Sequence, residues 1–212
     1  MQAGELRPER GRLLDVGCGA GVFLSLARVR GWDVRGVENS AAASRYAGES
    51  VGVEMGEGML KAVSHESGTF DVVTKWDSIE HVAHPLAVLR EVRRIFKPGG
   101  YVMLHTPNEA GLLKLIARVC CQATFGLFRY PVTKLYHVCH LYYCTPSTLV
   151  LMLERERFKL KEIERVATSL GARLAHGEAH RQVNLGARAS RRARVPATRY
   201  RAQAVRGEGT GG

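Results

Sequence analysis

Short apolar blocks alternate with amphipathic stretches over the first three quarters of the chain. Residues 13–16 are apolar except for Asp15, which predicts a buried strand, and residues 21–30 follow with the spacing of a helix. This succession repeats, so the pattern predicts an α/β fold of parallel βαβ units with right-handed crossovers in one sheet. The further predicted strands are residues 32–38, 51–55, 70–74, 101–104 and 159–166, and the further predicted helices are residues 41–47, 85–96 and 146–156.

The helix predicted over residues 85–96 has one apolar face. Leu86, Leu89, Val92 and Ile95 recur every third residue, and charged residues lie between them. We expect this face to pack against the sheet.

A long apolar insert, residues 110–143, follows the fifth predicted strand. Lys114, Arg118 and Gln122 repeat every four residues and apolar residues occupy much of the remainder, which predicts an amphipathic helix. Such a face can cover a pocket of the protein or lie on a membrane surface as a peripheral contact. Of these two, we expect a lid over the pocket.

Residues 171–212 differ in composition from the rest of the chain. They contain nine arginines, no lysine and two acids, which supply +7 of the formal charge of +11. Because they hold few apolar residues, we expect a disordered, dispensable tail after one domain at residues 1–170. No strand pattern is recognisable after Val166, and only 11 residues precede Arg12, where the first strand pattern begins. The sheet is therefore expected to be truncated at both ends.

Cysteine usage points to a reducing compartment. The five cysteines have no paired C-x-x-C spacing, and an odd number fits no closed disulfide framework. His137 and His140 with Cys139 and Cys144 lack the second paired spacing of a zinc site. The first 12 residues are polar, and no long uncharged apolar run occurs. We expect a cytoplasmic protein with no transmembrane segment.

A cluster of small residues separates the first predicted strand from the first predicted helix. Gly17, Gly19 and Gly21 permit a tight turn and let a ligand lie against the main chain, with amide groups at a helix N-terminus facing it. Glu38 ends the second predicted strand, where a carboxylate can accept hydrogen bonds from two ribose hydroxyls. The unit predicts an adenosine-type cofactor, but Val22 stands where a nicotinamide-type G-x-G-x-x-G loop has its third glycine.

The observed spacing, D-x-G-x-G-x-G from Asp15, resembles the first motif of class I S-adenosylmethionine-dependent methyltransferases. The segments FDVVTKWDSIEHVAHP, LREVRRIFKPGGYVMLHTPN and HLYYCTPSTLVLMLERERFKL also look like segments of this family, in its order, and in particular like its ubiquinone-pathway members. The resemblance covers roughly residues 12–166. It implies a Rossmann-like three-layer sandwich with a mostly parallel central sheet and S-adenosyl-L-methionine as the cofactor.

The resemblance also implies roles for individual residues. The three glycines would cradle the amino-acid end of the methyl donor, Asp15 would organise their loop, and Glu38 would hold the ribose. Residues 57–60, with Gly58 and Met59, would flank the adenine. Lys75, Trp76 and Asp77 would lie beside the methionine portion and the transferring methyl. The implied cofactor-binding residues are Asp15, Gly17, Gly19, Gly21, Glu38, Gly58, Met59 and Asp77.

Asp77, Glu80 and His81 fall within one turn after the fourth predicted strand. They resemble an acid-x-x-Glu-His segment of ubiquinone-pathway O-methyltransferases and small-RNA 2′-O-methyltransferases, which can ligate a divalent metal. In the RNA enzymes a later histidine, in a segment like residues 140–143, completes that site. Alternatively, Glu80 braces the helix and His81 acts as a general base toward an acceptor hydroxyl. We expect His81 and Asp77 to be catalytic and assign no metal.

These features predict an enzyme that methylates a small-molecule or lipid-like acceptor, at oxygen. Two alternatives remain open from the sequence. One is a catalytically impaired remnant that keeps the fold, and the other is an RNA-directed methyltransferase, suggested by the arginine-rich tail. Nucleic acid is the less expected partner, because unstructured arginines bind any polyanion and Tyr200 is the only aromatic residue of the tail.

Overall fold

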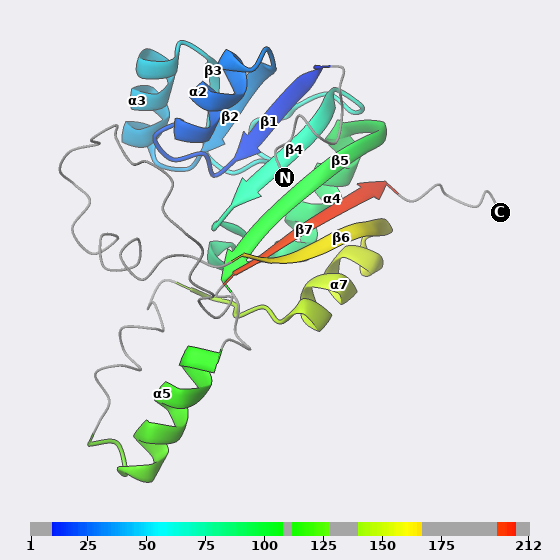
Figure 1. Cartoon of the computed structure of the whole chain (residues 1–212). Coiled ribbons are helices and arrows are strands. Elements are labelled where there is room, and N and C mark those ends of the chain that lie inside the picture. The colour runs from blue at the N-terminus through cyan, green and yellow to red at the C-terminus, as the bar shows by residue number, and fades with distance from the viewer. Residues whose placement is uncertain (1–9, 108–111, 128–139, 167–198, 207–212) are drawn as a thin grey trace.

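The computed structural model describes residues 10–107, 112–127, 140–166 and 199–206. Seven strands form one sheet in the order β3-β2-β1-β4-β5-β7-β6 (Figure 1). β7 is antiparallel to both of its neighbours, and the other pairs of adjacent strands are parallel. The strands are β1 (Arg12–Val16), β2 (Asp33–Glu38), β3 (Glu54–Glu57), β4 (Phe70–Trp76), β5 (Phe96–Pro107), β6 (Phe158–Val166) and β7 (Arg199–Arg206).

Helices cover both faces of the sheet, as a three-layer sandwich requires. Leu24 and Ala27 of α2 are buried with Leu13, Val34 and other residues of the sheet in one core cluster. A second cluster on the other face contains the buried residues of α4 and α7. The helices are α2 (Val22–Val29), α3 (Ala41–Val51), the 3-10 turn η1 (Ile79–His81), α4 (Pro85–Ile95), α5 (Leu112–Ala123) and α7 (Pro146–Arg155).

The amphipathic pattern of α4 is confirmed, since Leu89, Val92 and Ile95 are fully buried. The strand predicted at residues 51–55 begins later than expected. α3 continues to Val51, and Gly52 then ends it in the left-handed conformation, so β3 starts only at Glu54.

The prediction that the sheet lacks a seventh strand is wrong. β7 lies between β5 and β6 and pairs along its length with both, from Arg199 to Val205 on β5 and from Arg199 to Arg206 on β6. Its buried side chains are small or polar, namely Ala202, Gln203 and Ala204. A strand held mainly by backbone pairing carries no strong apolar pattern, and for this reason the sequence analysis missed it. The rest of the predicted disordered tail, residues 171–198 and 207–212, lies outside the described residues.

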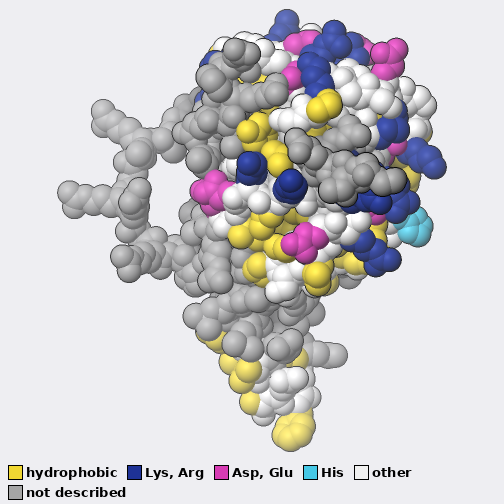
Figure 2. Space-filling view, turned by 90° about the vertical axis from the view of Figure 1, so that its right-hand side faces the viewer, with side chains coloured by type: hydrophobic (Ala, Val, Ile, Leu, Met, Phe, Trp, Pro, Cys, Tyr) yellow, Lys and Arg dark blue, Asp and Glu magenta, His cyan; other side chains and the backbone are white. Residues whose placement is uncertain are grey.

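The helix predicted within the insert is present as α5, which projects away from the carboxyl edge of the sheet (Figure 1). Several apolar side chains of this region are exposed: Ile116 and Val119 on the helix, and Phe125 and Leu127 beyond its end. Figure 2 shows hydrophobic side chains at the far end of this projection. Within the described ranges, no helix has the length and apolarity needed to span a membrane.

Candidate active site

The three glycines of the loop between β1 and α2 all adopt left-handed backbone conformations, with φ of 77°, 54° and 75° at Gly17, Gly19 and Gly21. A Cβ atom added at Gly17 would lie 2.9 Å from the side chain of Ser78, and one added at Gly21 would lie 3.0 Å from that of Ala47. At Gly19 an added Cβ would meet no atom within 4 Å. Glycine is therefore required on both sides of the loop by packing, and its middle is open for a ligand to approach.

Glu38 ends β2 directly beside this loop. Its Oε2 atom accepts a hydrogen bond of 2.8 Å from the amide of Gly19, and its Oε1 atom accepts one of 2.9 Å from the amide of Ser40. The half-buried carboxylate is thus held in place by two backbone amides and retains free lone pairs on both oxygens. An acid at this position suits the two hydroxyls of a ribose.

Gly58 and Met59 follow β3 on the other side of Glu38. The amide of Gly58 donates a 2.9 Å hydrogen bond to the carbonyl oxygen of Glu38, which places the two residues together. The side chain of Met59 is 71% exposed, whereas Leu60 next to it is buried in the core. Met59 thus offers apolar surface that a flat ring could cover.

Asp15 lies beneath the loop and is not open to solvent. Its carboxylate accepts a 2.7 Å hydrogen bond from the hydroxyl of Thr74 on the neighbouring strand β4. Burial raises the pKa of Asp15 to about 7, against the opposing effects of Thr74 and of the positive charge of Lys75. Asp15 joins β1 to β4 immediately before the glycines, so it can organise the loop without touching a ligand.

Asp77 and His105 form a pair at the ends of β4 and β5. Asp77 Oδ1 lies 3.0 Å from His105 Nδ1, and the amide of Asp77 donates to the carbonyl oxygen of His105. Asp77 has a φ of 43°, an uncommon conformation for a residue other than glycine and one found at functional sites. The ring of Trp76 packs between those of Phe23 and His105, at centroid distances of 5.1 and 5.4 Å.

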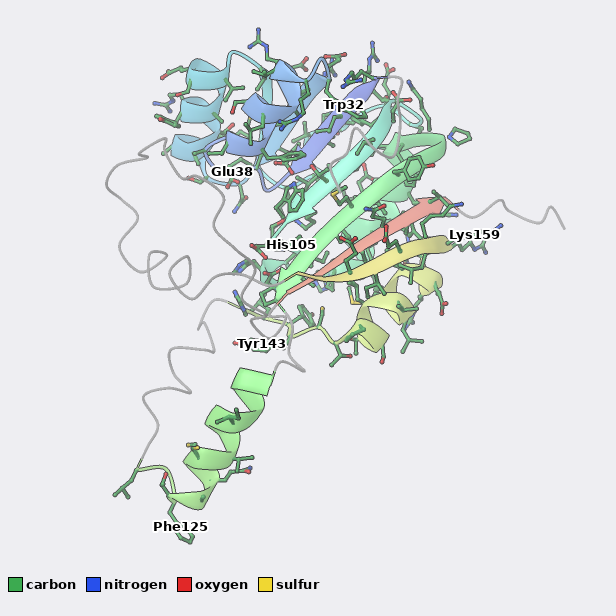
Figure 3. All side chains as sticks on the ribbon, in the orientation of Figure 1. Trp32, Glu38, His105, Phe125, Tyr143 and Lys159 are labelled. Carbon is green, nitrogen blue, oxygen red and sulfur yellow. The ribbon has the colours of Figure 1, made fainter. Side chains whose placement is uncertain are left out.

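Sequence reasoning missed His105. Its signal was its place at the end of a strand, because parallel strands end at the same edge of a sheet. Figure 3 shows Glu38 and His105 along that edge, with Tyr143 below them.

Glu80, His81 and His140 form a second group at this edge. One ligating atom from each lies within 4.8 Å of the others, and the two imidazole rings are 4.7 Å apart. The carbonyl oxygen of Glu80 accepts hydrogen bonds from the amides of Leu141 and Tyr142, which hold the segment after the insert against η1. A histidine about 60 positions away in the sequence is thereby brought beside His81.

Glu80 is almost completely buried in this group. Its Oε2 atom accepts a 3.1 Å hydrogen bond from the hydroxyl of Thr106, and its Oε1 atom has no hydrogen-bond partner among the described residues. Burial is the largest of the effects that raise the pKa of Glu80. One carboxylate and two imidazoles are a donor set suited to a divalent transition metal. Asp77, the other acid of the motif, is not part of the group and is paired with His105.

Cysteine chemistry is not favoured at this edge. Burial raises the pKa of Cys18, within the glycine loop, to about 12, so its thiol stays protonated and is a poor nucleophile. Of the residues weighed for zinc, His137 and Cys139 lie outside the described residues.

Comparisons with known proteins identify the family of the chain and its fold. The sequence model of a family described as "Methyltransferase domain" matches residues 1–162. The chain is 35% identical over 112 residues to a "Ubiquinone biosynthesis O-methyltransferase" of Ralstonia nicotianae. The matched region covers 50% of this chain and 47% of that protein. The chain thus spans about half the length of this curated relative.

Two solved structures share the fold. A "SAM dependent methyltransferase from Archaeoglobus fulgidus" superposes with a TM-score of 0.62 at 19% identity, over 93% of this chain and 86% of that one. A phosphoethanolamine N-methyltransferase of Haemonchus contortus, solved "in complex with S-adenosyl-L-methionine", gives a TM-score of 0.64 at 16% identity, over 97% of this chain and 51% of that one.

Proposed function

Because this chain belongs to the class I S-adenosylmethionine-dependent methyltransferases, we propose that it transfers a methyl group to an oxygen atom of a small-molecule or lipid-like acceptor. The observation that carries the proposal is the position of the Glu80–His81–His140 group and the Asp77–His105 pair. Both lie at the edge of the sheet where the glycine loop opens. Imidazoles suit the removal of a proton from a hydroxyl near neutral pH.

The cofactor fits the residues at the ends of β1, β2 and β3. The open middle of the loop at Gly19 leaves room for its amino-acid end, and Glu38 offers oxygens to the ribose hydroxyls. Gly58 and Met59 would lie against the adenine. The bound sulfonium supplies an electrophilic methyl group.

His81 is the residue we assign as general base. It is exposed, it follows Asp77 after the end of β4, and it lies beside His140. Asp77 holds the ring of His105 by hydrogen bonding to Nδ1, which leaves Nε2 as the other ring nitrogen able to take part in proton transfer. His81 and His105 therefore both offer an imidazole to the acceptor hydroxyl, and His81 is the more accessible of the two.

A metal-assisted version of the same reaction is the second candidate. The buried Oε1 atom of Glu80 without a partner among the described residues, together with His81 and His140, fits the donor set of a divalent cation. A metal held there would lower the pKa of an acceptor hydroxyl and orient it. In that case His81 would be a ligand and not the base.

The choice of oxygen and of an apolar acceptor has separate support. The Ralstonia relative is named as an O-methyltransferase of ubiquinone biosynthesis. The exposed apolar side chains of the α5 region, Phe125 and Leu127 among them, are suited to contact a hydrophobic acceptor. The insert would then act as a lid over the acceptor.

The test is a methylation assay with S-adenosylmethionine and a panel of acceptors. The panel holds hydroxylated aromatic compounds with and without an isoprenoid tail, an aromatic amine and an RNA oligonucleotide. We expect S-adenosylhomocysteine to form with a hydroxylated aromatic compound, and faster when the tail is present. Methylation of the RNA alone would contradict the proposal. Cofactor binding without turnover on any acceptor would favour a catalytically impaired protein.

A further inference from the structure

Lys75 is a lysine inside the central strand β4. Its neighbours on the strand, Val72, Val73 and Thr74, are completely buried, and Lys75 itself is 3% exposed. Lysine is almost never fully buried without a partner, because an ammonium group removed from water costs several kcal/mol. The presence of Lys75 at this position therefore calls for a ligand or a partner.

The ammonium group of Lys75 lies directly beneath the glycine loop. Its Nζ atom is 3.9 Å from the point where a Cβ atom of Gly17 would be. Ser78, which is also close to that point, donates its hydroxyl hydrogen to the carbonyl oxygen of Val16. Since residue 17 is glycine, no side chain from the loop covers the ammonium group.

The side chain of Lys75 forms no hydrogen bond or ion pair in the part of the chain that the structure describes, whereas its backbone pairs with β5. The charges that act on it are those of Asp15, Glu80 and Glu38, which oppose the effect of burial on its pKa. Burial lowers the pKa of Lys75 to about 8, so the ammonium remains mostly charged at neutral pH. Other basic residues, such as Lys97 with Asp71 and Arg35 with Glu54, have acidic partners.

The amide groups of the glycine loop are largely engaged within the protein. Gly17 and Cys18 donate to the carbonyl oxygen of Val37, Gly21 donates to that of Cys18, and Gly19 donates to Glu38. An anion that approaches the loop therefore finds few free backbone donors there. The sequence expectation that loop amides would face the ligand does not hold for these four amides.

We propose that Lys75 is an anion-binding residue of the cofactor site, whose ammonium group receives the α-carboxylate at the methionine end of S-adenosylmethionine. The inference rests on the proposed placement of the cofactor over the glycine loop. A buried cation whose side chain has no partner among the described residues, beneath a loop whose amides are mostly engaged, provides a charged donor for the anion. A charge-assisted contact of this kind contributes more than a hydrogen bond between neutral groups.

The test compares two ligands that differ only in the amino-acid portion. S-Adenosylhomocysteine carries the carboxylate, and methylthioadenosine lacks the whole amino-acid portion. We expect Lys75→Met to lower the affinity for S-adenosylhomocysteine by roughly 10- to 100-fold and to leave the affinity for methylthioadenosine unchanged, as measured by calorimetry. The matched control is Lys159→Met, an exposed lysine on β6 at the far end of the sheet, which should change neither affinity.

Equal weakening of both ligands, or weakening of neither, would overturn the assignment of Lys75. If Lys75→Met changes only the Michaelis constant of a carboxylated acceptor, the assignment is also overturned, because Lys75 would then bind the acceptor and not the cofactor. If Lys75→Met does not fold, the wild-type chain is titrated with decarboxylated S-adenosylmethionine, and Lys75→Gln replaces the variant. Binding of decarboxylated and intact cofactor with equal affinity would also overturn the proposal. A wrong placement of the cofactor gives a different result from a wrong assignment of Lys75. In that case Glu38→Ala would bind methylthioadenosine with the affinity of the wild type.

Discussion

The carboxylate of Glu38 and the amide of Gly19 are joined by a hydrogen bond of 2.8 Å, which ties the end of β2 to the middle of the glycine loop. The acid is therefore already oriented at the loop before any ligand binds. A preoriented acceptor loses less conformational entropy when a ribose arrives.

We predict that Glu38→Ala weakens S-adenosylhomocysteine and methylthioadenosine alike, by about 1–3 kcal/mol, because both ligands carry the ribose. Calorimetry measures both affinities. Glu54→Gln, an exposed acid on the neighbouring strand β3, serves as the control and should bind both ligands normally. Unchanged affinities in Glu38→Ala would show that this acid serves only the loop.

His81→Ala should lower turnover by about 10²-fold or more and leave the affinity for S-adenosylhomocysteine nearly unchanged, since a positioned base acts on the acceptor. His84→Ala, three positions along the chain and also exposed, is the matched control. Steady-state kinetics with the best acceptor of the panel separates the two. Full turnover in His81→Ala would make this imidazole structural.

The metal-assisted version predicts a different set of sensitive residues. Chelation should abolish activity, and Glu80→Gln and His140→Ala should lower both activity and bound metal measured by elemental analysis. Asp77→Asn should retain its metal, because Asp77 is paired with His105 and lies outside the group. Activity that survives chelation in wild-type protein with no bound metal would rule this version out.

Asp15→Asn should change how stability depends on pH. The pKa of Asp15 in the folded state, about 7, is above the ordinary value of 3.8, so the folded state holds this proton more tightly than the unfolded state. The contribution of Asp15 to the free energy of unfolding is therefore present below pH 4 and is lost as pH rises toward 7.

Asparagine has no proton to lose, so the stability of Asp15→Asn relative to wild type should increase by about 2–4 kcal/mol between pH 4 and 7. Urea unfolding across this range measures the difference. The control is Asp33→Asn, at an exposed acid paired with Arg12. Its free energy of unfolding should change with pH nearly as that of the wild type does. A parallel profile for Asp15→Asn as well would mean that Asp15 is ionised in the folded protein.

The assignment of β7 to the sheet predicts that a chain ending at Leu170 is strongly destabilised. Removal of β7 leaves β5 and β6 without the strand that joins them and exposes the core around Ala202 and Ala204. We expect the melting temperature to fall by about 10 °C or more. A chain ending at Arg206 keeps β7 and is the control. Equal melting temperatures of the two shortened chains would show that β7 is not part of the fold.

The sequence determined those features that depend on local periodicity or on backbone conformation. Leu89, Val92 and Ile95 recur at helical spacing and are buried in α4. Gly17, Gly19 and Gly21 predicted a tight turn after a strand, and all three adopt left-handed conformations there. Both features depend only on residues that are close together in the sequence, so they can be predicted from the sequence without knowing the tertiary contacts.

The tertiary structure alone decided the features that join distant segments. β7 is a strand because β5 and β6 leave a gap that its backbone fills, and its own side chains give little indication of this. His105 meets Asp77, and His140 meets His81, only because the strands and the segment after the insert end at one edge of the sheet. Lys75 becomes an unpaired buried cation only when β4 is placed between β1 and β5. Pairing and burial depend on which segments become neighbours, and that choice is made by the free energy of the whole sheet.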